Sequence, residues 1–322
     1  MRIHILDQPS DEETELLLSS LDKSIRLSFG PDLADGGNVD GLVAGRPSRD
    51  LLDQLKSLRF LIVPWAGIPD ETISLLANFP NIQLFNLHHN AAPAAELALA
   101  LLMTVAKRVI KFDQDLREGD WSLRYQESET VLLEGKKALI LGYGNIGHKI
   151  RKSLEGLGII VQVIKRSVKE GDAQKSIYPL SMLRDLLPES EILILAVPLT
   201  NETERIITES ELSLLPKNAI LINISRGKII DQKALFAVLK DKSIFGAGLD
   251  VWYNYPNSDE DRAHTFPADY PFHELDNVVM SPHRGGLVKE TEQLRMIDLA
   301  RSLNAAAKGE LIPNRVNIEL GY

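Results

Sequence analysis

Short runs of apolar residues alternate with amphipathic stretches along almost the whole chain. In the first part of the chain, the stretches between the apolar runs repeat apolar residues every three or four positions, as on one face of a helix. Strands that alternate with helices are typical of a parallel sheet with helices on both faces. The pattern predicts strands at 2–6, 25–29, 39–43, 60–63 and 82–87, and helices at 12–21, 49–58 and 70–78.

A second unit of the same kind follows one long helical stretch. Apolar residues recur at helical spacing from about Pro93 towards Leu116, and we expect a single helix there that connects two domains. The sequence therefore predicts an α/β protein with two doubly wound parallel-sheet domains. Strands of the second domain are predicted to begin at Ala138 and Ile159 and to cover 192–196, 219–224, 245–249 and 278–280.

A glycine pattern stands where the second domain begins. The apolar run Ala138-Leu-Ile-Leu141 leads into Gly142-Tyr-Gly-Asn-Ile-Gly147, and a helical pattern follows. Strand, Gly-x-Gly-x-x-Gly and helix together form a dinucleotide-binding fingerprint. Gly142 permits the tight turn, Gly144 lets the backbone approach a pyrophosphate, and Gly147 lets the helix pack closely on the strand. The phosphates of the dinucleotide bind at the helix N-terminus.

The residues after the next strand indicate which dinucleotide binds. An NAD site places an Asp or Glu roughly 20 residues beyond the glycines, where it accepts a hydrogen bond from the ribose 2′-hydroxyl. That place holds Lys165, Arg166 and Ser167. Two cations and a hydroxyl suit a 2′-phosphate and supply no carboxylate acceptor. NADP is therefore the preferred cofactor, with NAD possible; a solvated Lys-Arg pair is the alternative interpretation.

Three further strand ends carry polar residues. Arg226 follows the run 219–224, Asp250 ends the run 245–249, and His283 follows 278–280. Doubly wound sheets bind ligands at the carboxyl ends of their strands, so these side chains are candidates for the site. A guanidinium suits a substrate carboxylate, and a histidine is suited to give a proton to a carbonyl oxygen near neutral pH. Asp250 is equally consistent with a turn or helix cap.

Composition limits the other possibilities. The 322 residues are 44% apolar and 25% charged, with a net charge of −9 and no cysteine. This balance argues against nucleic acid or an anionic membrane as the main partner, and it excludes disulfides and thiolate chemistry. No stretch reaches the roughly 18 apolar residues of a membrane span, and acidic residues from Asp7 onward do not fit a signal peptide. We expect a cytoplasmic protein.

The motifs together resemble the D-isomer-specific 2-hydroxyacid dehydrogenase family, in particular its glyoxylate/hydroxypyruvate reductases, over essentially the whole length. Besides the glycine fingerprint, the resemblance is carried by these segments: Trp65-Ala-Gly67, Asn86 with Ala92-Pro-Ala-Ala-Glu96, Trp121 with Leu133-Glu-Gly-Lys-Lys137, Ala196-Val-Pro-Leu-Thr-Asn-Glu-Thr203, Asn223-Ile-Ser-Arg-Gly227 with Asp231, Gly246-Ala-Gly-Leu-Asp-Val251 and Ser281-Pro-His-Arg-Gly-Gly286.

The resemblance implies two domains with a cleft that closes on the substrate. A discontinuous, flavodoxin-like substrate-binding domain would comprise 1–103 and 287–322, and a Rossmann cofactor domain would comprise 104–286. Family members are usually dimers joined through the cofactor domain, so a homodimer is expected.

The resemblance also implies roles for single residues. Arg226 would orient the 2-oxo acid and His283 would donate the proton, while the backbone of Ala66 and Gly67 would hold the substrate carboxylate. Asp250 would hold the nicotinamide carboxamide. The cofactor-binding residues implied are Gly142, Gly144, Asn145, Ile146, Gly147, Lys165, Arg166, Ser167, Pro198, Thr203, Ile224 and Asp250.

One position departs from the family pattern. Where the family usually has a Glu that is hydrogen-bonded to the catalytic His, this chain has Tyr255. A carboxylate fixes the imidazole and raises its pKa, whereas a tyrosine carries no charge at neutral pH. A carboxylate from Asp259-Glu-Asp261 could replace the Glu, His283 could work with a lower pKa and a more acidic optimum, or the chain could have lost the reaction. We favour the second account.

Two other features are unusual. An insertion at 257–266 and the pair His88-His89 both lie where a cleft would open, so either could shape substrate choice. Ordinary loop residues are the alternative for the two histidines. With no cysteine and no matching His/Asp cluster nearby, we predict no metal.

The sequence thus predicts an oxidoreductase that transfers a hydride between NADP(H) and a small 2-oxo or D-2-hydroxy acid such as glyoxylate or hydroxypyruvate. One alternative is an NAD-linked phosphoglycerate- or lactate-type dehydrogenase. Another is a catalytically weakened, nucleotide-sensing binding protein. A purely structural α/β protein would leave the glycines, Arg226 and His283 unexplained. The side chain of the substrate is not specified by the sequence.

Overall fold

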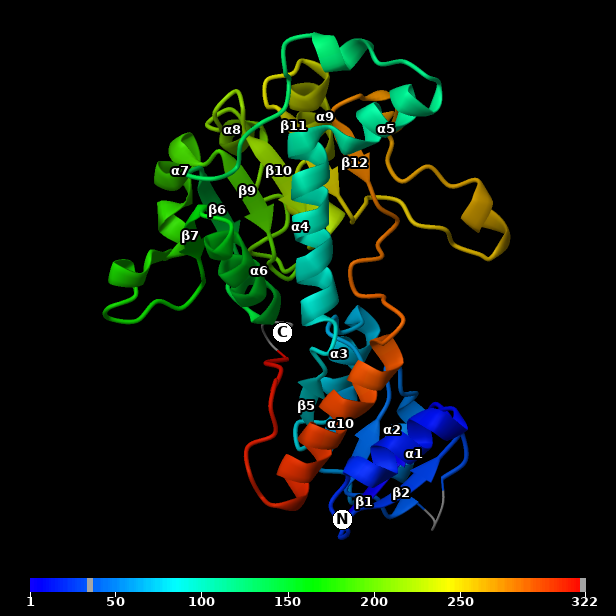
Figure 1. The fold of residues 1–322 in the computed structure, drawn as a ribbon. Helices are drawn as coiled ribbons and strands as arrows, with labels where there is room; N and C mark the ends of the chain where they lie inside the picture. The colour runs from blue at the N-terminus through cyan, green and yellow to red at the C-terminus, as the bar shows by residue number, and fades with distance from the viewer. Residues whose placement is uncertain (34–36, 319–322) are drawn as a thin grey trace. The chain divides into compact units, whose positions relative to one another are not determined.

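The computed structural model describes residues 1–33 and 37–318 (Figure 1). Contacts divide the chain into two compact units. The first comprises Met1–Asn90 and Leu287–Tyr322, and the second comprises Ala91–Gly286. The expected α/β class with two parallel sheets is confirmed.

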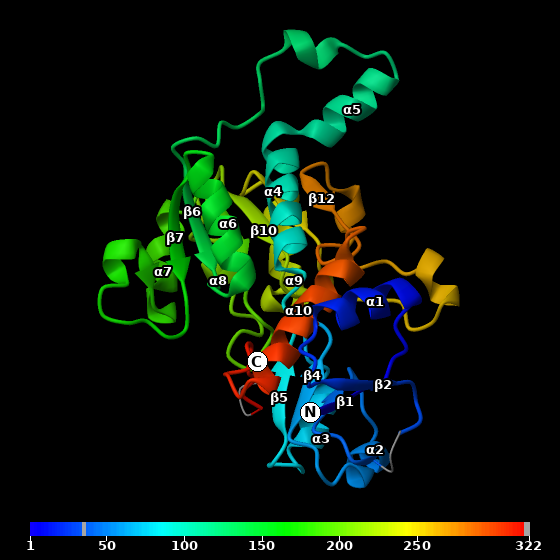
Figure 2. The ribbon, with the colours of Figure 1, turned by 60° about the horizontal axis from the view of Figure 1, so that its bottom comes forward.

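The first unit contains a five-stranded sheet in the order β2-β1-β3-β4-β5, and all of its strand pairs are parallel. Figure 2 shows α1 beside α10, although they lie at opposite ends of the chain. The elements are β1 (Arg2–Ile5), α1 (Asp11–Ser20), β2 (Arg26–Phe29), β3 (Gly41–Val43), α2 (Arg49–Gln54), β4 (Phe60–Val63), α3 (Asp70–Leu76), β5 (Gln83–Asn86) and α10 (Thr291–Ala307).

Alternation along the strands explains why this sheet carries helices on both faces. In β4, Phe60 and Ile62 pack with α1 and α10, whereas Leu61 and Val63 pack with α2 and α3. Successive side chains of a strand point to opposite faces, and every residue of β4 is buried. A strand apolar at every position therefore requires a helical layer on each side.

The second unit contains a seven-stranded parallel sheet in the order β12-β11-β10-β9-β6-β7-β8. Its strands are β6 (Lys137–Leu141), β7 (Ile160–Ile164), β8 (Ile177–Tyr178), β9 (Ile192–Leu195), β10 (Ile220–Asn223), β11 (Gly246–Leu249) and β12 (Val278–Met280). Its helices are α4 (Ala91–Lys107), α5 (Val109–Arg117), α6 (Asn145–Gly156), α7 (Leu183–Leu186), α8 (Glu209–Leu212) and α9 (Gln232–Lys240).

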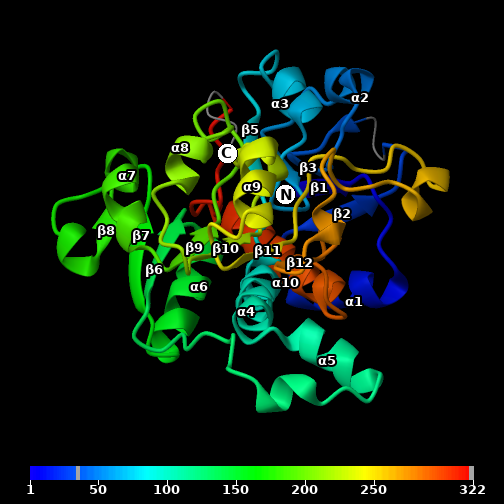
Figure 3. The same cartoon turned by 90° about the horizontal axis from the view of Figure 1, so that it is seen from above.

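This sheet also lies between two helical layers. Ile140 of β6 packs with α4 and α6, whereas Leu139 and Leu141 pack with the layer of α7, α8 and α9. Figure 3 shows α4 and α6 on one side of the sheet and α7, α8 and α9 on the other. Among residues 1–33 and 37–318, no helix is both long and apolar enough to cross a lipid bilayer.

The single long helix predicted after Pro93 is wrong, because the helix breaks at Arg108. Arg108 has a left-handed backbone (φ 50°) between α4 and α5. Its guanidinium lies 5.5 Å from the centre of the Phe245 ring and 3.2 Å from the Glu129 carboxylate. These contacts stabilise the left-handed backbone of Arg108. The spacing of apolar residues gives no indication of a single residue with positive φ, so the sequence pattern does not predict the break.

The first part of the first unit ends earlier than the sequence predicts. The sequence predicts a boundary at residue 103, whereas the whole of α4 belongs to the second unit. Buried side chains of α4, among them Ala98, Leu102 and Val105, pack against the seven-stranded sheet and α6. Burial of its apolar face thus assigns α4 to the cofactor-type unit.

Candidate active site

The polar residues predicted at strand ends share one edge of the seven-stranded sheet. Gly142 follows β6, Arg226 follows β10, Asp250 follows β11, and His283 follows β12. All these strands are parallel, so their carboxyl ends point the same way. The sheet thus brings the glycine turn and three candidate side chains to the edge at which doubly wound folds bind ligands.

The glycine turn has the geometry that each position requires. Gly142 has φ 108°, and a Cβ there would overlap the backbone of Ala196 after β9. A Cβ at Gly147 would overlap the carbonyl oxygen of Gly142, so α6 packs directly on the turn. The sequence-based roles of Gly142 and Gly147 are both consistent with this geometry.

Gly144 differs, because a Cβ at this position would meet nothing within 4 Å. Gly144 is the N-cap of α6 and has no side chain to occupy the helix end. The open space lies at a helix N-terminus, where backbone N–H groups and the helix dipole favour an anion. A dinucleotide pyrophosphate fits this arrangement, with Asn145 and Ile146 in the first turn of α6.

The cations after β7 are held by neighbouring acids. Lys165 Nζ lies 3.3 Å from an oxygen of the Asp172 carboxylate, and Arg166 Nε lies 3.8 Å from the Glu202 carboxylate. The Asp172 pKa is lowered by hydrogen bonds from the Lys169 backbone and the Lys165 ammonium. Ser167 is exposed beside them. Asp172 and Glu202 thus position Lys165 and Arg166 and partly neutralise their charges.

The hydroxyl of Thr203 stabilises the conformation of the loop after β9. Thr203 Oγ1 donates to the carbonyl oxygen of Pro198 at 2.6 Å and accepts from the Thr200 N–H at 2.8 Å. These bonds close the loop into a compact turn after β9. Ile224, after β10, is buried with the sheet core.

The turn that carries Arg226 is fixed by its neighbours. The Asn223 side chain accepts from the Ser225 N–H at 3.0 Å and donates to the Arg226 carbonyl oxygen at 3.1 Å. A Cβ at Gly227 would overlap the Trp252 backbone, so the turn packs against the segment after β11. The exposed Arg226 guanidinium is therefore presented on a rigid turn.

The Asp250 carboxylate is engaged by the segment that carries His283. One oxygen accepts from the Ser281 hydroxyl at 2.5 Å and the Arg284 N–H at 2.7 Å, and the other accepts from the Gly285 N–H at 2.9 Å. Asp250 is 2% exposed. A carboxylate has about four acceptor positions, and these donors occupy three of them.

His283 lies at the centre of this segment with a left-handed backbone (φ 58°). Its Nδ1 lies 3.0 Å from the Tyr255 hydroxyl. His283 is exposed as a whole residue, yet desolvation and, next, the positive charge of Arg226 lower the pKa of its ring, while Asp250 acts to raise it. The Arg226 charge acts on both His283 and Tyr255, which places the three side chains in one electrostatic environment.

The insertion at 257–266 does not supply the missing carboxylate. Asp259, Glu260 and Asp261 are exposed, and none of them contributes to the pKa of His283. Asp259 pairs with Arg262 at 2.5 Å within the insertion. Of the three accounts of Tyr255, the structure thus disfavours a substitute carboxylate and supports a lowered pKa of His283.

The predicted carboxylate-binding residues Ala66 and Gly67 lie in the first unit, in the loop after β4. The Asn86 side chain donates to the Ala66 carbonyl oxygen at 2.6 Å and accepts from His88 Nε2 at 3.0 Å. Asn86 thereby connects this loop to His88, the first residue of the His88-His89 pair.

His88 and His89 are in desolvated surroundings. Burial lowers the pKa of His88, and burial followed by the charge of Arg295 lowers the pKa of His89 to about 4. The His88 N–H donates to the Asp298 carboxylate at 2.8 Å. Both histidines are therefore neutral at neutral pH. Within the described part of the chain, no three His, Asp or Glu side chains converge as metal ligands.

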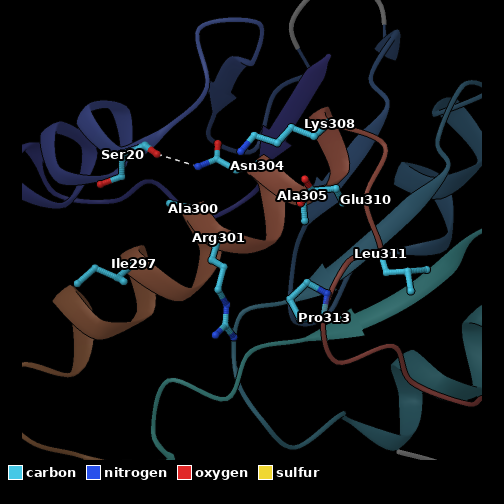
Figure 4. Close-up of a pocket in the computed structure, with 10 residues that line it drawn as sticks. All are labelled: Ser20, Ile297, Ala300, Arg301, Asn304, Ala305, Lys308, Glu310, Leu311 and Pro313. Atoms are coloured by element: carbon cyan, nitrogen blue, oxygen red, sulfur yellow. Dashed lines mark hydrogen bonds between the residues drawn. The ribbon is translucent and has the colours of Figure 1, made fainter.

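A pocket of about 660 Å³ lies in the first unit, along α10 and the segment that follows it (Figure 4). Asn304 lines this pocket and donates to the Ser20 carbonyl oxygen at 2.9 Å. None of the predicted site residues lines this pocket. The candidate chemistry is therefore assigned to the strand ends of the second unit.

Two positioning residues escaped the sequence analysis. The Trp252 indole donates to the Ser281 carbonyl oxygen at 2.8 Å, and its backbone N–H donates to the Tyr255 hydroxyl at 3.1 Å. Ser281 binds Asp250 as described above. Ser281 lies inside the motif that carries His283, and Trp252 directly follows the motif that carries Asp250, but nothing in their spacing shows that they meet.

Comparison with known proteins agrees with this site. Residues 99–285 match the model of the D-isomer specific 2-hydroxyacid dehydrogenase, NAD binding domain. A glyoxylate reductase of Korarchaeum cryptofilum is 37% identical over 229 residues, which cover 70% of this chain and 66% of the reductase. The match therefore spans just under two thirds of that relative.

Two further comparisons extend over the full chain. A glyoxylate reductase of Aeropyrum pernix is 31% identical over 333 aligned residues, covering 99% of this chain and 96% of the relative. A D-isomer specific 2-hydroxyacid dehydrogenase of Xanthobacter autotrophicus, solved with NADPH and MES, superposes with a TM-score of 0.79 at 21% identity, covering 100% and 99% of the two chains. The motifs, the fold and the family match agree, and the chain belongs to the D-isomer-specific 2-hydroxyacid dehydrogenase family.

Proposed function

We propose that this protein is an oxidoreductase that interconverts a small 2-oxo acid and the corresponding D-2-hydroxy acid, with glyoxylate or hydroxypyruvate as the substrate class. The main observation behind this proposal is that Arg226 and His283 lie at the carboxyl ends of strands in the same sheet, at the edge where the glycine turn follows β6. The similarity to glyoxylate reductases supports the choice of substrate class.

The proposed chemistry follows from the two side chains. The reduced nicotinamide supplies the hydride that the carbonyl carbon receives. Arg226 binds the substrate carboxylate through its planar guanidinium, which fixes the orientation of the carbonyl group. Protonated His283 gives its Nε2 proton to the carbonyl oxygen, so that oxygen becomes the hydroxyl group of the 2-hydroxy acid and the ring becomes neutral. In this role Asp250 retains one acceptor position for the carboxamide of the nicotinamide.

We further propose that NADP(H) is preferred, because Lys165 and Arg166 lie after β7 where an NAD-specific site carries an acid. A 2′-phosphate competes with Asp172 and Glu202 for these cations. In an Arg166→Gln variant, kcat/KM for NADPH is expected to fall roughly 10- to 100-fold with little change for NADH. Lys169→Gln removes an exposed neighbouring charge as the matched control. Equal kcat/KM values for the two cofactors in the wild type would contradict the preference.

The proposed assembly is a homodimer formed through the second unit. α5 has no buried residue, and the segment through Leu132 exposes large apolar side chains. Figures 1 and 2 show α5 and this segment extending away from the sheet. A pocket of about 330 Å³ beside α5 includes Arg108, Phe245 and His273 in its lining. A second copy would cover the exposed side chains, which are Val109 (49% exposed), Ile110 (44%), Phe112 (39%), Leu116 (49%), Trp121 (60%), Tyr125 (83%) and Leu132 (67%).

The test of the reaction is consumption of NADPH, and separately of NADH, against a panel of 2-oxo acids between about pH 5 and pH 9. We expect turnover with glyoxylate or hydroxypyruvate, and its loss in His283→Ala with cofactor binding retained. Arg226→Lys should raise KM and lower kcat, because an ammonium cannot form the bidentate contact.

Absence of turnover, together with tight NADP(H) binding by calorimetry, would overturn the enzyme proposal. The nucleotide-sensing alternative would then apply, since Tyr255 in place of the family Glu is the feature that favours it. A preference for NADH with phosphoglycerate- or lactate-type acids would indicate the other enzyme alternative.

A further inference from the structure

The hydrogen bonds around Tyr255 define which atom donates to which. Tyr255 Oη has two partners in the described part of the chain, the Trp252 N–H at 3.1 Å and His283 Nδ1 at 3.0 Å. A backbone N–H only donates, so Tyr255 Oη accepts from Trp252. The single hydroxyl hydrogen is therefore free to point at His283 Nδ1.

The same assignment of donors and acceptors indicates which tautomer the neutral His283 ring adopts. When the Tyr255 hydroxyl donates to Nδ1, that nitrogen carries no hydrogen and the ring proton is on Nε2. With the ring proton on Nδ1 instead, Oη would accept twice, and its hydrogen would turn away from the ring towards solvent, to which Tyr255 is 44% exposed; the Nε2-protonated form is the one in which the hydroxyl hydrogen stays within the protein. The Trp252 N–H also polarises the hydroxyl and makes it a stronger donor.

We propose that Tyr255 is a positioning residue that holds neutral His283 as the tautomer with its proton on Nε2, and that it thereby disfavours the neutral ring with a bare Nε2 that oxidation of the hydroxy acid requires. This inference rests on the proposed function for its kinetic consequence, whereas the tautomer itself is a property of the protein alone.

The consequence follows from what each nitrogen does. In the imidazolium, Nδ1–H donates to a lone pair of Tyr255 Oη, and Nε2–H is available to the carbonyl oxygen. For the reverse reaction, the base must be a bare Nε2, which the resting tautomer lacks. A carboxylate in place of Tyr255 would accept from Nδ1–H in both protonation states, keep Nε2 bare in the neutral ring, and stabilise the imidazolium.

The charged groups around the ring act together with Tyr255. Arg226, on the turn after β10, disfavours the imidazolium, and Asp250, at the end of β11, favours it. Desolvation is the largest influence and disfavours it. With the pKa of His283 lowered, kcat/KM for reduction is expected to decline as pH rises through that lowered value, and the rate of oxidation to decline as pH falls through it.

The first experiment measures the tautomer by ¹⁵N NMR of histidine-labelled protein, with His283→Asn used to assign the resonances among the seven histidines. The wild type is expected to show a protonated Nε2 and a bare Nδ1 in the neutral ring. Tyr255→Phe should give a mixture of tautomers, and Tyr255→Glu should give the Nδ1-protonated form. Because no turnover is needed, the result stands apart from the outcome of the proposed function.

The second experiment is the pH profile of kcat/KM in the same variants. Tyr255→Glu should move the alkaline limb of reduction upward by roughly one to three pH units, the usual effect of an opposite charge within 4–6 Å. Tyr255→Phe should lower kcat with little change of KM, since the proposed role of Tyr255 is exerted through His283 and not on the substrate. Tyr253→Phe is the matched control, because the Tyr253 hydroxyl donates to the Ile230 carbonyl oxygen at 3.1 Å instead.

A wild-type spectrum with the proton on Nδ1 would overturn the proposal, and so would a Tyr255→Glu profile identical to that of the wild type. Loss of turnover in every protein, with the expected tautomers present, would overturn the proposed function and leave the tautomer assignment in place.

Discussion

The Ser281 hydroxyl donates to the Asp250 carboxylate at 2.5 Å, and this bond joins the ends of β11 and β12. The same carboxylate accepts from the N–H groups of Arg284 and Gly285, so it binds the chain on both sides of His283. His283 itself has φ 58°, a conformation that costs energy for a residue with a side chain. We infer that Asp250 holds His283, the proposed proton donor, in place, in addition to the role towards the cofactor that the family resemblance implies.

Asp250→Asn should therefore impair turnover more than Ser281→Ala. The amide places an NH₂ group against backbone donors, and bonds to a charged group contribute about 1.5–3 kcal/mol. We expect kcat to fall roughly 10- to 100-fold in Asp250→Asn and less in Ser281→Ala. Steady-state kinetics and the melting temperature of each variant check this. Equal effects of the two substitutions would show that the backbone contacts do not matter.

Gly144→Ala should separate cofactor binding from folding. The added Cβ meets no protein atom within 4 Å, and φ at this position is −79°, so the fold should tolerate it. It would instead occupy the space in which a pyrophosphate approaches the backbone. We expect the Kd for NADPH to rise at least about tenfold, which corresponds to about 1.4 kcal/mol of binding free energy.

The matched control for this variant is Gly156→Ala at the other end of α6, where a Cβ also meets nothing within 4 Å. It should leave the Kd unchanged and slightly raise the melting temperature, because alanine is the better helix former. Calorimetric titration measures both variants. An unaltered Kd in Gly144→Ala would place the cofactor elsewhere.

Phe112→Glu combined with Leu116→Glu should dissociate the proposed dimer. Both side chains are exposed on α5, and burying a carboxylate in an apolar interface without a partner is strongly unfavourable. Sedimentation should show a mass near twice the monomer for the wild type and the monomer mass for the variant. Ile160→Glu changes an equally exposed apolar residue of β7 and should leave the mass unchanged. A monomeric wild type would refute the dimer.

His89 should make the first unit sensitive to acid. Its pKa is about 4 in the folded chain and 6.5 as the ordinary value, so the unfolded chain binds the proton first as pH falls. Stability is therefore full above about pH 6.5 and is lost progressively down to about pH 4, by roughly 1–3 kcal/mol. In His89→Gln, the decrease of melting temperature between pH 7 and pH 4.5 should be smaller. His264→Gln, at an exposed position, should behave as the wild type.

The sequence by itself determined the class of the fold and the identity of the candidate residues. Apolar runs with no polar alternation, such as Phe60–Val63 and Ile192–Leu195, are typical of strands covered on both faces, and both runs form such strands. The glycine fingerprint located the turn after β6 because tight φ angles and close packing demand glycine itself. These features depend on residues that are close together in the sequence, so they can be predicted from the sequence alone.

The tertiary structure decided how those residues are held. The break at Arg108 depends on Phe245 and Glu129, which are distant in sequence. The contacts of Asp250 with Ser281, and of Tyr255 with His283, join segments about thirty residues apart. The spacing of residues along the chain does not predict these contacts, because they result from the pairing of β11 with β12. Hydrogen-bond direction, tautomer and pKa depend on those meetings, so only the folded chain specifies them.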